Sequence, residues 1–357
     1  MKYRLDKIAN VTMGQSPKSE FYNSEGKGTP FLQGNRTFGV KSPTFDTYTT
    51  LVTKLAQAGD VIMSVRAPVG DLNISPIDMC LGRGVCSIRM KNGNQEFLYY
   101  LMKYYMPQLV NKESGTVFGS VNRNDINGLE VDIPEDTVIQ QKIGRYLTMI
   151  DDKIELNNKI NENLEQQAQY IFNNMFPNVS SGENSIGDTI IPKRGKGLLS
   201  KDAVLGEVPV VAGGLEPATY HNVANTIAPV LVISASGANA GYVSLWNIPV
   251  WSSDSSYIDS SMTDDVYFWY VLLKKRQREI FDAQTGSAQP HIYPQHIAAM
   301  PVINLKSDTI TEFTTLVTPL FKTIGHNKEE NIRLVALRNN LLPKLMTGEL
   351  DVSEIDL

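Results

Sequence analysis

The chain has 357 residues, 42% hydrophobic and 20% charged, which is ordinary for a folded protein with room for two or three domains. No apolar run reaches the ~18 residues that cross a bilayer, and the N-terminal segment lacks the apolar stretch of a signal peptide. Two cysteines, Cys80 and Cys86, are too few for a disulfide scaffold or a cysteine-rich zinc site. We therefore expect a cytoplasmic protein.

The formal net charge of −5 argues against general binding of polyanions. The charge is uneven along the chain: residues 1–135 hold 15 Lys and Arg against 13 Asp and Glu, whereas residues 178–305 hold 8 against 11. Any surface for nucleic acid must therefore be a local patch.

The first 135 residues read as one mixed α/β domain. Apolar runs with β-branched residues alternate with Gly, Ser and Asn turns, and an amphipathic helical pattern follows. The informative segments are TPFLQGN (29–35), DVIMSVRAPVG (60–70), EFLYYLMKY (96–104) and ESGTVFGSVNRNDI (113–126).

Residues 136–177 predict one long helix. Apolar residues recur in alternating steps of four and three, which is typical of a coiled-coil seam, and asparagine occupies two central positions. The seam positions are Ile143, Leu147, Ile150, Ile154, Asn157, Asn161, Leu164, Ala168, Ile171 and Met175.

Residues 178–305 repeat the first domain in the same order but with weaker similarity. The matching segments are VPVVAGG (208–214), PVLVISASGANAG (229–241), YFWYVLLKK (267–275) and QTGSAQPHIYPQHI (284–297). We expect the aromatic run at 267–270 to lie in a helix core and not to form a base-stacking platform.

Residues 306–357 repeat the heptad pattern, shifted by 170 residues, and predict a second long helix. Among the paired positions, Arg338 departs from its apolar counterpart Ala168. Pro319, Gly325 and Pro343 predict that this helix is kinked or less regular. Its seam positions are Phe313, Val317, Leu320, Ile324, Asn327, Asn331, Leu334, Arg338, Leu341 and Leu345.

The asparagines suggest how the two helices pair, because a seam asparagine fixes register at a cost in stability. Antiparallel pairing, with facing residue numbers that sum to 488, matches Asn157 with Asn331 and Asn161 with Asn327. Parallel pairing also matches asparagine with asparagine, but the intervening domain favours opposite directions and a pseudo-two-fold molecule. The helix pair would be a spacer of ~60 Å. The alternative is two amphipathic helices packed on a globular core.

Capping patterns predict where both helices begin. Thr137 with Gln140, and Thr309 with Glu312, each match the Thr-x-x-Gln or Thr-x-x-Glu capping box.

The segment IPEDTVIQQKIGRYLTMIDDKIELNNKINENLEQQ, the terminal LRNNLLPKLMTGEL and the strings VPVVAGG and QTGSAQPHI resemble specificity subunits of type I restriction-modification systems. The resemblance covers the whole chain. It implies two α/β target recognition domains (1–135 and 178–305) separated by two long helices (136–177 and 306–357) that form an antiparallel coiled coil. Each domain would read one half of a bipartite, asymmetric site in double-stranded DNA.

The same resemblance implies that the chain is a non-catalytic subunit. The helices would set the spacer between the half-sites and dock two modification subunits. Those subunits would methylate adenine with S-adenosylmethionine, and separate restriction subunits would use ATP with Mg²⁺. The chain itself would need no cofactor.

Motifs for catalysis are missing from the sequence, which agrees with that implication. There is no amino-methyltransferase motif, no P-loop, no G-x-S-x-G elbow and no His or Cys spacing that favours metal binding.

Residues that contact DNA are expected at Gly-containing turns, where backbone N–H groups approach phosphates and Arg, Asn or Gln side chains read base edges. A solvated loop is the alternative for each of them. In the first domain the candidates are Gln33, Asn35, Arg36, Ser64, Arg66, Arg83, Thr116, Ser120, Asn122 and Arg123. In the second domain, which has no Lys or Arg between Lys201 and Lys274, they are Lys193, Arg194, Lys196, Gly213, Gly214, Ser234, Ser236, Asn239, Ser253, Ser287, Gln289 and His291.

A second hypothesis from another class is a coiled-coil scaffold whose globular ends bind proteins. The acidic balance of the second domain favours it. Specific DNA binding should weaken steeply with salt while the sequence preference remains, whereas a scaffold would show no sequence preference at any salt concentration.

Overall fold

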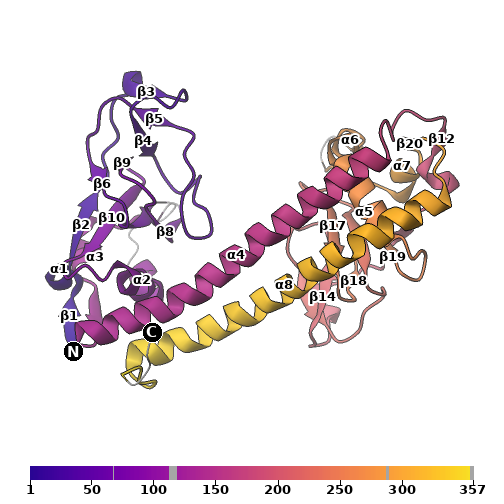
Figure 1. Cartoon of the computed structure of the whole chain (residues 1–357). Helices are drawn as coiled ribbons and strands as arrows, with labels where there is room; N and C mark the ends of the chain where they lie inside the picture. Colours follow the sequence, from indigo (N-terminus) through magenta and orange to yellow (C-terminus); the bar gives the residue numbers. More distant parts are fainter. Residues whose placement is uncertain (67, 112–118, 287–288, 354–357) are drawn as a thin grey trace. The chain divides into compact units, whose positions relative to one another are not determined.

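The computed structural model describes the chain except for residues 67, 112–118, 287–288 and 354–357. Contacts divide the chain into two compact units: unit 1 comprises Met1–Ile154 and Ile332–Leu357, and unit 2 comprises Glu155–Asn331. Both units combine strands and helices (Figure 1), so the predicted mixed α/β class is confirmed. None of the described helices is long and apolar enough to span a membrane.

Unit 1 is built on two sheets. A four-stranded antiparallel sheet has the order β2-β10-β7-β8, and a second sheet has the order β3-β5-β4-β9-β6. The strands are β2 Ala9–Met13, β3 Tyr22–Asn23, β4 Thr29–Leu32, β5 Tyr48–Thr49, β6 Leu55–Ala56, β7 Val61–Val65, β8 Val69–Ile74, β9 Met79–Leu81 and β10 Val85–Met90; β1 Lys2–Arg4 pairs with β11 Glu130–Asp132. The helices are α1 Leu5–Ile8, η1 Ser19–Phe21, α2 Gln95–Val110 and α3 Arg123–Asn127.

Strand β7 shows why these residues form a central strand. Successive side chains of a strand point to opposite faces. Val61, Met63 and Val65 join the core under α2, while Ile62 joins the smaller core under the second sheet. Both faces are buried, which explains the continuous apolar run VIMSV.

Unit 2 has the same plan. Its main sheet has the order β13-β19-β16-β17, beside a smaller sheet β15-β14-β18. The strands are β12 Asn184–Ser185, β13 Lys193–Arg194, β14 Val208–Val211, β15 Thr219–His221, β16 Val230–Ser234, β17 Val243–Trp246, β18 Trp251–Ser252, β19 Ser255–Asp259 and β20 Pro301–Val302, which pairs with β12. The short helices are η2 Ile186–Asp188, η3 Ser200–Asp202, α5 Val266–Lys275, α6 Gln277–Asp282 and α7 Pro294–Ala298.

The two units share a strand order that follows the sequence repeat. β7 and β16 each lie third in the order of their main sheet. In the smaller sheets, β4 pairs in parallel with β9, and β14 pairs in parallel with β18. Helices α2 and α5 pack against the equivalent main sheets. The aromatic run predicted to be helix core, residues 267–270, lies buried in α5, and that prediction is confirmed.

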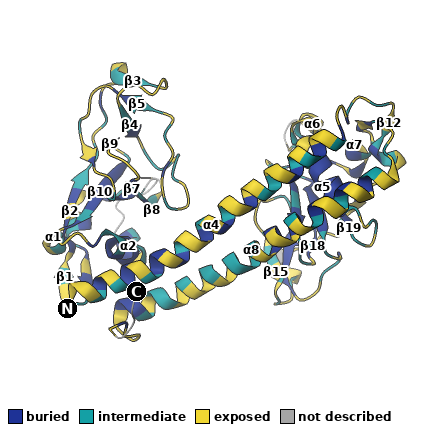
Figure 2. Ribbon diagram, viewed as in Figure 1, coloured by how far each residue is buried: buried dark blue, intermediate teal, exposed yellow. Residues whose placement is uncertain are grey.

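The two long helices are α4, Thr137–Met175, and α8, Ser307–Thr347. α8 continues through Pro319, Gly325 and Pro343, so none of these residues ends it, and the kink expected there stays a prediction. Figure 2 shows buried residues recurring along one face of each helix, the pattern of an amphipathic helix.

The predicted capping boxes are wrong in both helices. α4 begins at Thr137, so the residue before it, Asp136, acts as the cap and its carboxylate accepts the N–H of Val138 over 2.8 Å. Gln140 instead donates its amide to the carbonyl of Pro134. α8 begins at Ser307, which places Thr309 inside the helix. Asp caps a helix as well as Thr does, so sequence alone does not choose between neighbouring capping residues.

Within unit 2 the asparagines of α4 and α8 contact each other. Asn157 donates to Asn331 over 2.9 Å, and Asn327 donates to Asn161 over 2.8 Å. These are the two pairs that opposite helix directions predict. Asn157 also donates to Glu330 over 2.7 Å.

Away from the asparagines, the helices pack on the globular cores, as the alternative predicted. Phe172 of α4, Phe176 directly after α4 and Phe321 of α8, all outside the predicted seam, are buried in the core of unit 2. In unit 1, Ile143 of α4 and Leu345 of α8 belong to the core beneath α2. A heptad pattern describes the packing of a helix against one partner helix. Here each long helix contacts the other helix and also packs on the globular cores.

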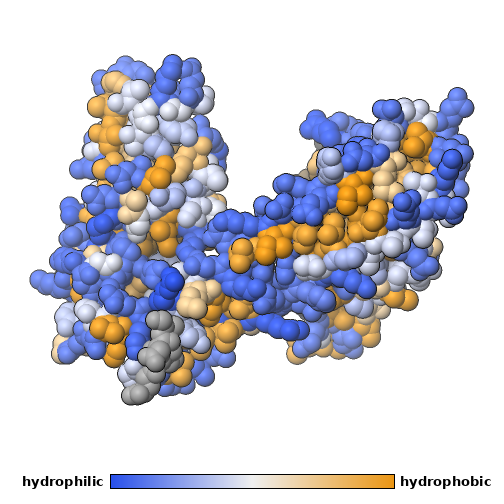
Figure 3. Space-filling model, in the orientation of Figure 1, coloured by the Kyte–Doolittle hydropathy of each residue, from blue (hydrophilic) through white to orange (hydrophobic). Residues whose placement is uncertain are grey.

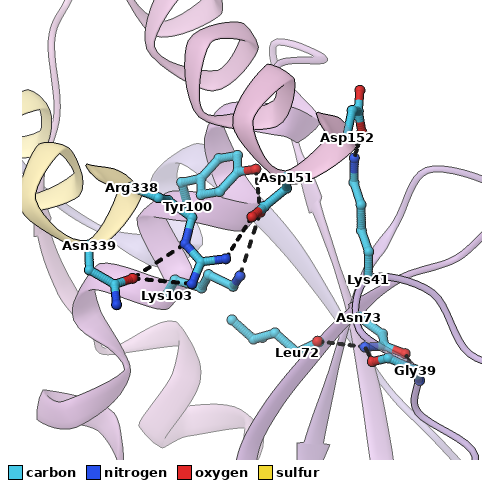
Figure 4. A network of polar contacts seen from close by, with 10 residues as sticks. All are labelled: Gly39, Lys41, Leu72, Asn73, Tyr100, Lys103, Asp151, Asp152, Arg338 and Asn339. Carbon is cyan, nitrogen blue, oxygen red and sulfur yellow. Dashed lines mark hydrogen bonds and ion pairs between the residues drawn. The ribbon is translucent and has the colours of Figure 1, made fainter. Parts of the chain in front are cut away.

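A buried polar network joins three helices of unit 1 (Figure 4). Asp151 of α4 forms an ion pair with Arg338 of α8 over 2.6 Å and accepts the hydroxyl of Tyr100 of α2 over 2.7 Å. Lys103 lies 3.8 Å from the same carboxylate. Burial raises the pKa of Tyr100, with the negative charge of Asp151 adding to it, and burial lowers the pKa of Lys103. Tyr100 therefore stays protonated and donates to Asp151.

Candidate nucleic-acid interface

Gln33 and Arg83 lie together in unit 1, where β4 and β9 end. The Ser16 hydroxyl donates to Gln33 Oε1 over 2.8 Å and accepts the backbone N–H of Arg83 over 3.1 Å. The backbone at Gly14 lies close to the turn that carries Arg83. Only glycine fits there, because a Cβ on Gly14 would lie 2.0 Å from the carbonyl oxygen of Gly82. Both predicted side chains are exposed at the surface. The sequence did not predict the role of Ser16, because no motif in its neighbourhood points to a contact with Gln33 or Arg83.

Arg66, Ser120, Asn122 and Arg123 form a neighbouring group. The residue before Arg66 donates its backbone N–H to the carbonyl of Gly84, and Arg66 and Ser120 form an isolated β-bridge. The Asn122 side chain caps α3 by accepting two backbone N–H groups, and Arg123 is exposed in the first turn of that helix. Segments far apart in the sequence thus meet beside one turn.

The remaining candidates of unit 1 mostly hold the loops in place. Asn35 donates to Asp71 over 2.6 Å, and Arg36 pairs with Asp46 over 2.8 Å. The hydrogen bond from Arg36 lowers the pKa of Asp46. Ser64 is fully buried; its hydroxyl donates to the carbonyl of Pro68 in the following turn and accepts the N–H of Asp71 in β8. Thr116 lies outside the described residues.

In unit 2, Asp254 joins two of the predicted residues. Its carboxylate accepts a hydrogen bond from Arg194 over 2.5 Å and another from the hydroxyl of Ser236. Asn239 donates to the carbonyl of Gly213, and a Cβ on Gly213 would lie 2.7 Å from the carbonyl oxygen of Ser236. Four predicted residues are therefore brought together around Asp254, which the sequence analysis did not select.

His291 adjoins the same cluster through an isolated β-bridge with Ser236. Its backbone N–H and carbonyl both bond to Thr285, which closes the loop between them. Its ring stacks on that of Tyr293 at 6.0 Å. Gln289 is exposed, and Ser287 lies outside the described residues.

The other candidates of unit 2 divide by burial. Ser234 and Ser253 are buried, and the Ser253 hydroxyl accepts the N–H of Leu198 over 3.0 Å. Lys193, Lys196 and Gly214 are exposed. Exposed cations can approach phosphates, whereas buried serines can only shape the loops.

The two clusters occupy equivalent places in their units. Arg66 and Ser236 each follow the third strand of the main sheet, and each forms a bridge with the segment that precedes α3 or α7. The two clusters carry exposed Arg, Asn, Gln, Lys and hydroxyl side chains. These donors suit contacts with phosphates and base edges. Among the described residues, no group of three or more His, Cys, Asp or Glu could hold a metal ion.

Known proteins with similar sequences and folds are type I specificity subunits. Residues 1–166 match the model of the type I restriction modification DNA specificity domain. The match covers a little under half of the chain, and the chain as a whole is similar to type I specificity subunits. The MjaIX specificity subunit of a type I restriction enzyme from Methanocaldococcus jannaschii is 26% identical over 343 residues, which cover 83% of this chain and 79% of that protein.

Two further relatives define the extent of the likeness. The MjaX protein of M. jannaschii, named for the same kind of subunit, is 36% identical over 170 residues, but the match spans only 47% of this chain and 40% of that protein. The crystal structure of a type I restriction-modification S subunit from M. genitalium has a TM-score of 0.66 at 20% identity and covers 97% of this chain and 95% of that one. At this identity the likeness establishes the fold of type I specificity subunits.

Proposed function

We propose that this chain is the non-catalytic sequence-specificity subunit of a type I restriction-modification complex, and that each unit reads one half of a bipartite, asymmetric site in double-stranded DNA. The observation that carries the proposal is the repeated polar cluster. Two sheets with the same strand order bring exposed donors to equivalent loops, and one of these sheets lies in the matched specificity domain. The loops carry different residues, so the two half-sites should differ.

The helices α4 and α8 would form an antiparallel coiled coil that sets the spacing between half-sites and docks two modification subunits. The asparagine pairs in unit 2 support the pairing. Exposed apolar residues along α4, including Met149, Leu156 and Ile160, support docking, because such side chains favour burial against a partner. Figure 3 shows apolar side chains among hydrophilic ones on the visible surface.

In this proposal the chemistry belongs to the partner subunits. The modification subunits would transfer a methyl group to adenine from S-adenosylmethionine, and restriction subunits would use ATP with Mg²⁺. The contribution of this chain is to select the sequence to which those subunits are brought.

The deciding experiment is to co-express the chain with the modification subunit encoded beside it and to map adenine methylation across a genome. One bipartite motif with a fixed gap is expected. A stable complex that methylates no defined motif, although its modification subunit is active with another specificity subunit, contradicts the proposal.

Two variants test the division of roles. Exchange of residues 1–135 for another recognition domain should change one half-site and leave the other intact; a change in both would contradict separate reading. Insertion of one heptad into each long helix should lengthen the gap between the half-sites. An unchanged gap would contradict the spacer role.

The scaffold hypothesis is kept as the second candidate because Arg194, in the more acidic half of the chain, is already paired with Asp254. Salt dependence separates the two functions. Specific binding should weaken steeply with salt, by a factor of roughly 10³ or more between 50 and 200 mM if about six phosphates are contacted, while the sequence preference persists. A scaffold would show no preference at any salt concentration.

A further inference from the structure

One turn of the repeated fold differs in length between the two units. In unit 1, Leu81 pairs with β4 and Val85 pairs with β7, which leaves three residues, Gly82, Arg83 and Gly84, between them. In unit 2 the equivalent strands end at Ser252 and resume at Ser255, which leaves two residues.

Hydrogen bonds align the two turns residue by residue. The carbonyl of Gly84 accepts the N–H of Val65, and the carbonyl of Asp254 accepts that of Ala235, the equivalent residue after β16. The N–H groups of Gly82 and Ser253 donate to the last residues of β4 and β14. Arg83 is therefore the added residue in unit 1, and Asp254 occupies the position of Gly84.

The same turn thus presents a cation in one unit and an anion in the other. Arg83 is exposed, and its guanidinium forms no ion pair with any residue that the structure describes. A side chain at Gly84 is excluded, because a Cβ there would lie 2.6 Å from the carbonyl oxygen of Gln33. Unit 1 can therefore carry no counterpart of the Asp254 carboxylate at this position.

Asp254 remains able to accept a further hydrogen bond. Arg194 donates to one carboxylate oxygen and Ser236 to the other, and each oxygen has two acceptor sites. The Asp254 side chain is 41% exposed, so the free sites face solvent. The positive charge of Arg194 offsets the repulsion that a carboxylate would feel near phosphates.

We propose that this turn determines base specificity in both half-sites and selects opposite kinds of base edge. Arg83 selects the two acceptors of guanine, O6 and N7, and Asp254 selects an amino group, that of cytosine N4 or adenine N6. This inference rests on the proposed function. It adds that one base of the first half-site is guanine and that one base of the second carries an amino group, each fixed by a single residue.

The test for unit 2 is Asp254→Asn in the complex with the modification subunit. Binding is measured against duplexes that carry every single-base change in both half-sites. Discrimination at one position of the second half-site should fall roughly tenfold or more, while the first half-site stays unchanged. Melting of the variant complex at the wild-type temperature confirms that the fold is intact.

The test for unit 1 is Arg83→Gln, measured in the same way. Loss of the guanine preference at one position of the first half-site is expected, with the second half-site unchanged. Arg278→Gln is the matched control, because that side chain is 85% exposed on α6 and pairs only with Asp282 among the residues described. It should leave every position unchanged.

Three results would overturn the inference while the wild-type complex still gives a bipartite motif. They are unchanged discrimination in Asp254→Asn and Arg83→Gln, a change in the wrong half-site, or loss of the same base preference in Arg194→Gln. The last would show that Asp254 only positions Arg194. A wild-type complex without any motif would instead reject the proposed function.

Discussion

The two units fill the same place between their helices with opposite chemistry. In unit 1, Asp151 and Arg338 form an ion pair whose side chains are 10% and 20% exposed, and Asp151 also accepts the Tyr100 hydroxyl. Shifted by 170 residues, these positions become Phe321 and Ala168 in unit 2. There both side chains are buried, and Phe321 packs edge-on against Tyr270 of α5 at 5.6 Å.

The difference teaches that the repeat preserves geometry and not the kind of interaction. A large cation and a small anion in unit 1 correspond to a small apolar residue and a large aromatic one in unit 2, so each pair of positions holds one large and one small side chain. Buried ion pairs and apolar groups of similar volume are often close in stability, but an ion pair tolerates the loss of one partner poorly. The two sites should therefore respond differently to substitution.

The largest effect is expected in the aromatic core of unit 2. Phe172→Ala removes a ring that lies 5.0 to 5.7 Å from Phe176, Phe268 and Phe313. The lost burial and the remaining cavity should lower the free energy of unfolding by about 4 kcal/mol. Denaturant unfolding followed by tryptophan fluorescence measures it, and a loss below about 1 kcal/mol would show that the rings repack.

The next effect is expected at the ion pair of unit 1. Arg338→Ala leaves the carboxylate of Asp151 buried without its main cation, since the Asp151 side chain is only 10% exposed. We expect a loss of about 3 kcal/mol. Arg278→Ala, on an exposed pair of unit 2, is the control and should change the unfolding free energy by less than about 0.5 kcal/mol. Equal effects of the two substitutions would contradict the role of burial.

A smaller effect is expected at the asparagine layer of unit 2, where polar side chains of α4 and α8 contact each other. Asn157→Ala leaves the amide of Asn331 without one of its partners, at a cost of about 1.5 kcal/mol. The same denaturant measurement applies. An increase in stability would mean that these asparagines serve register alone.

The smallest effect on stability is expected when the ion pair of unit 1 is replaced by the two apolar residues found at the equivalent positions of unit 2. Asp151→Phe combined with Arg338→Ala recreates the apolar pair in unit 1. The double variant should unfold within about 1 kcal/mol of the wild type, because both charges of the ion pair are removed together and Lys103, which also neighbours the Asp151 carboxylate, is 28% exposed. A double variant no more stable than Arg338→Ala would show that the two sites differ in shape as well as in charge.

Interpretation of the sequence went furthest where a pattern repeats. The heptad spacing predicted both long helices, and the paired strings predicted segments that occupy equivalent strands. It failed where a residue's role depends on a second partner. Phe172 and Phe321 fall outside the seam because they face the core of a globular unit, which no helical period describes.

The candidate site divides in the same way. Arg66, Arg83, Asn122 and Arg123 could be selected from residue type and neighbouring glycines, and the structure brings them to one part of unit 1. Asp254 could not be selected, because SSDSS has no distinctive pattern. Its role depends on Arg194 of β13 and on Ser236, which lie 60 and 18 residues away along the chain.

The sequence by itself determined the family resemblance, the mixed α/β class, the repeat and the two long helices, because these depend on periodicity and residue order. Only the tertiary structure decided which residue caps each helix, that Asp151 and Arg338 pair, and that one turn offers Arg83 in one unit and Asp254 in the other. The physical reason is that hydrogen bonds and ion pairs act over about 3 Å between side chains far apart in the chain, and only the folded backbone brings them within that range.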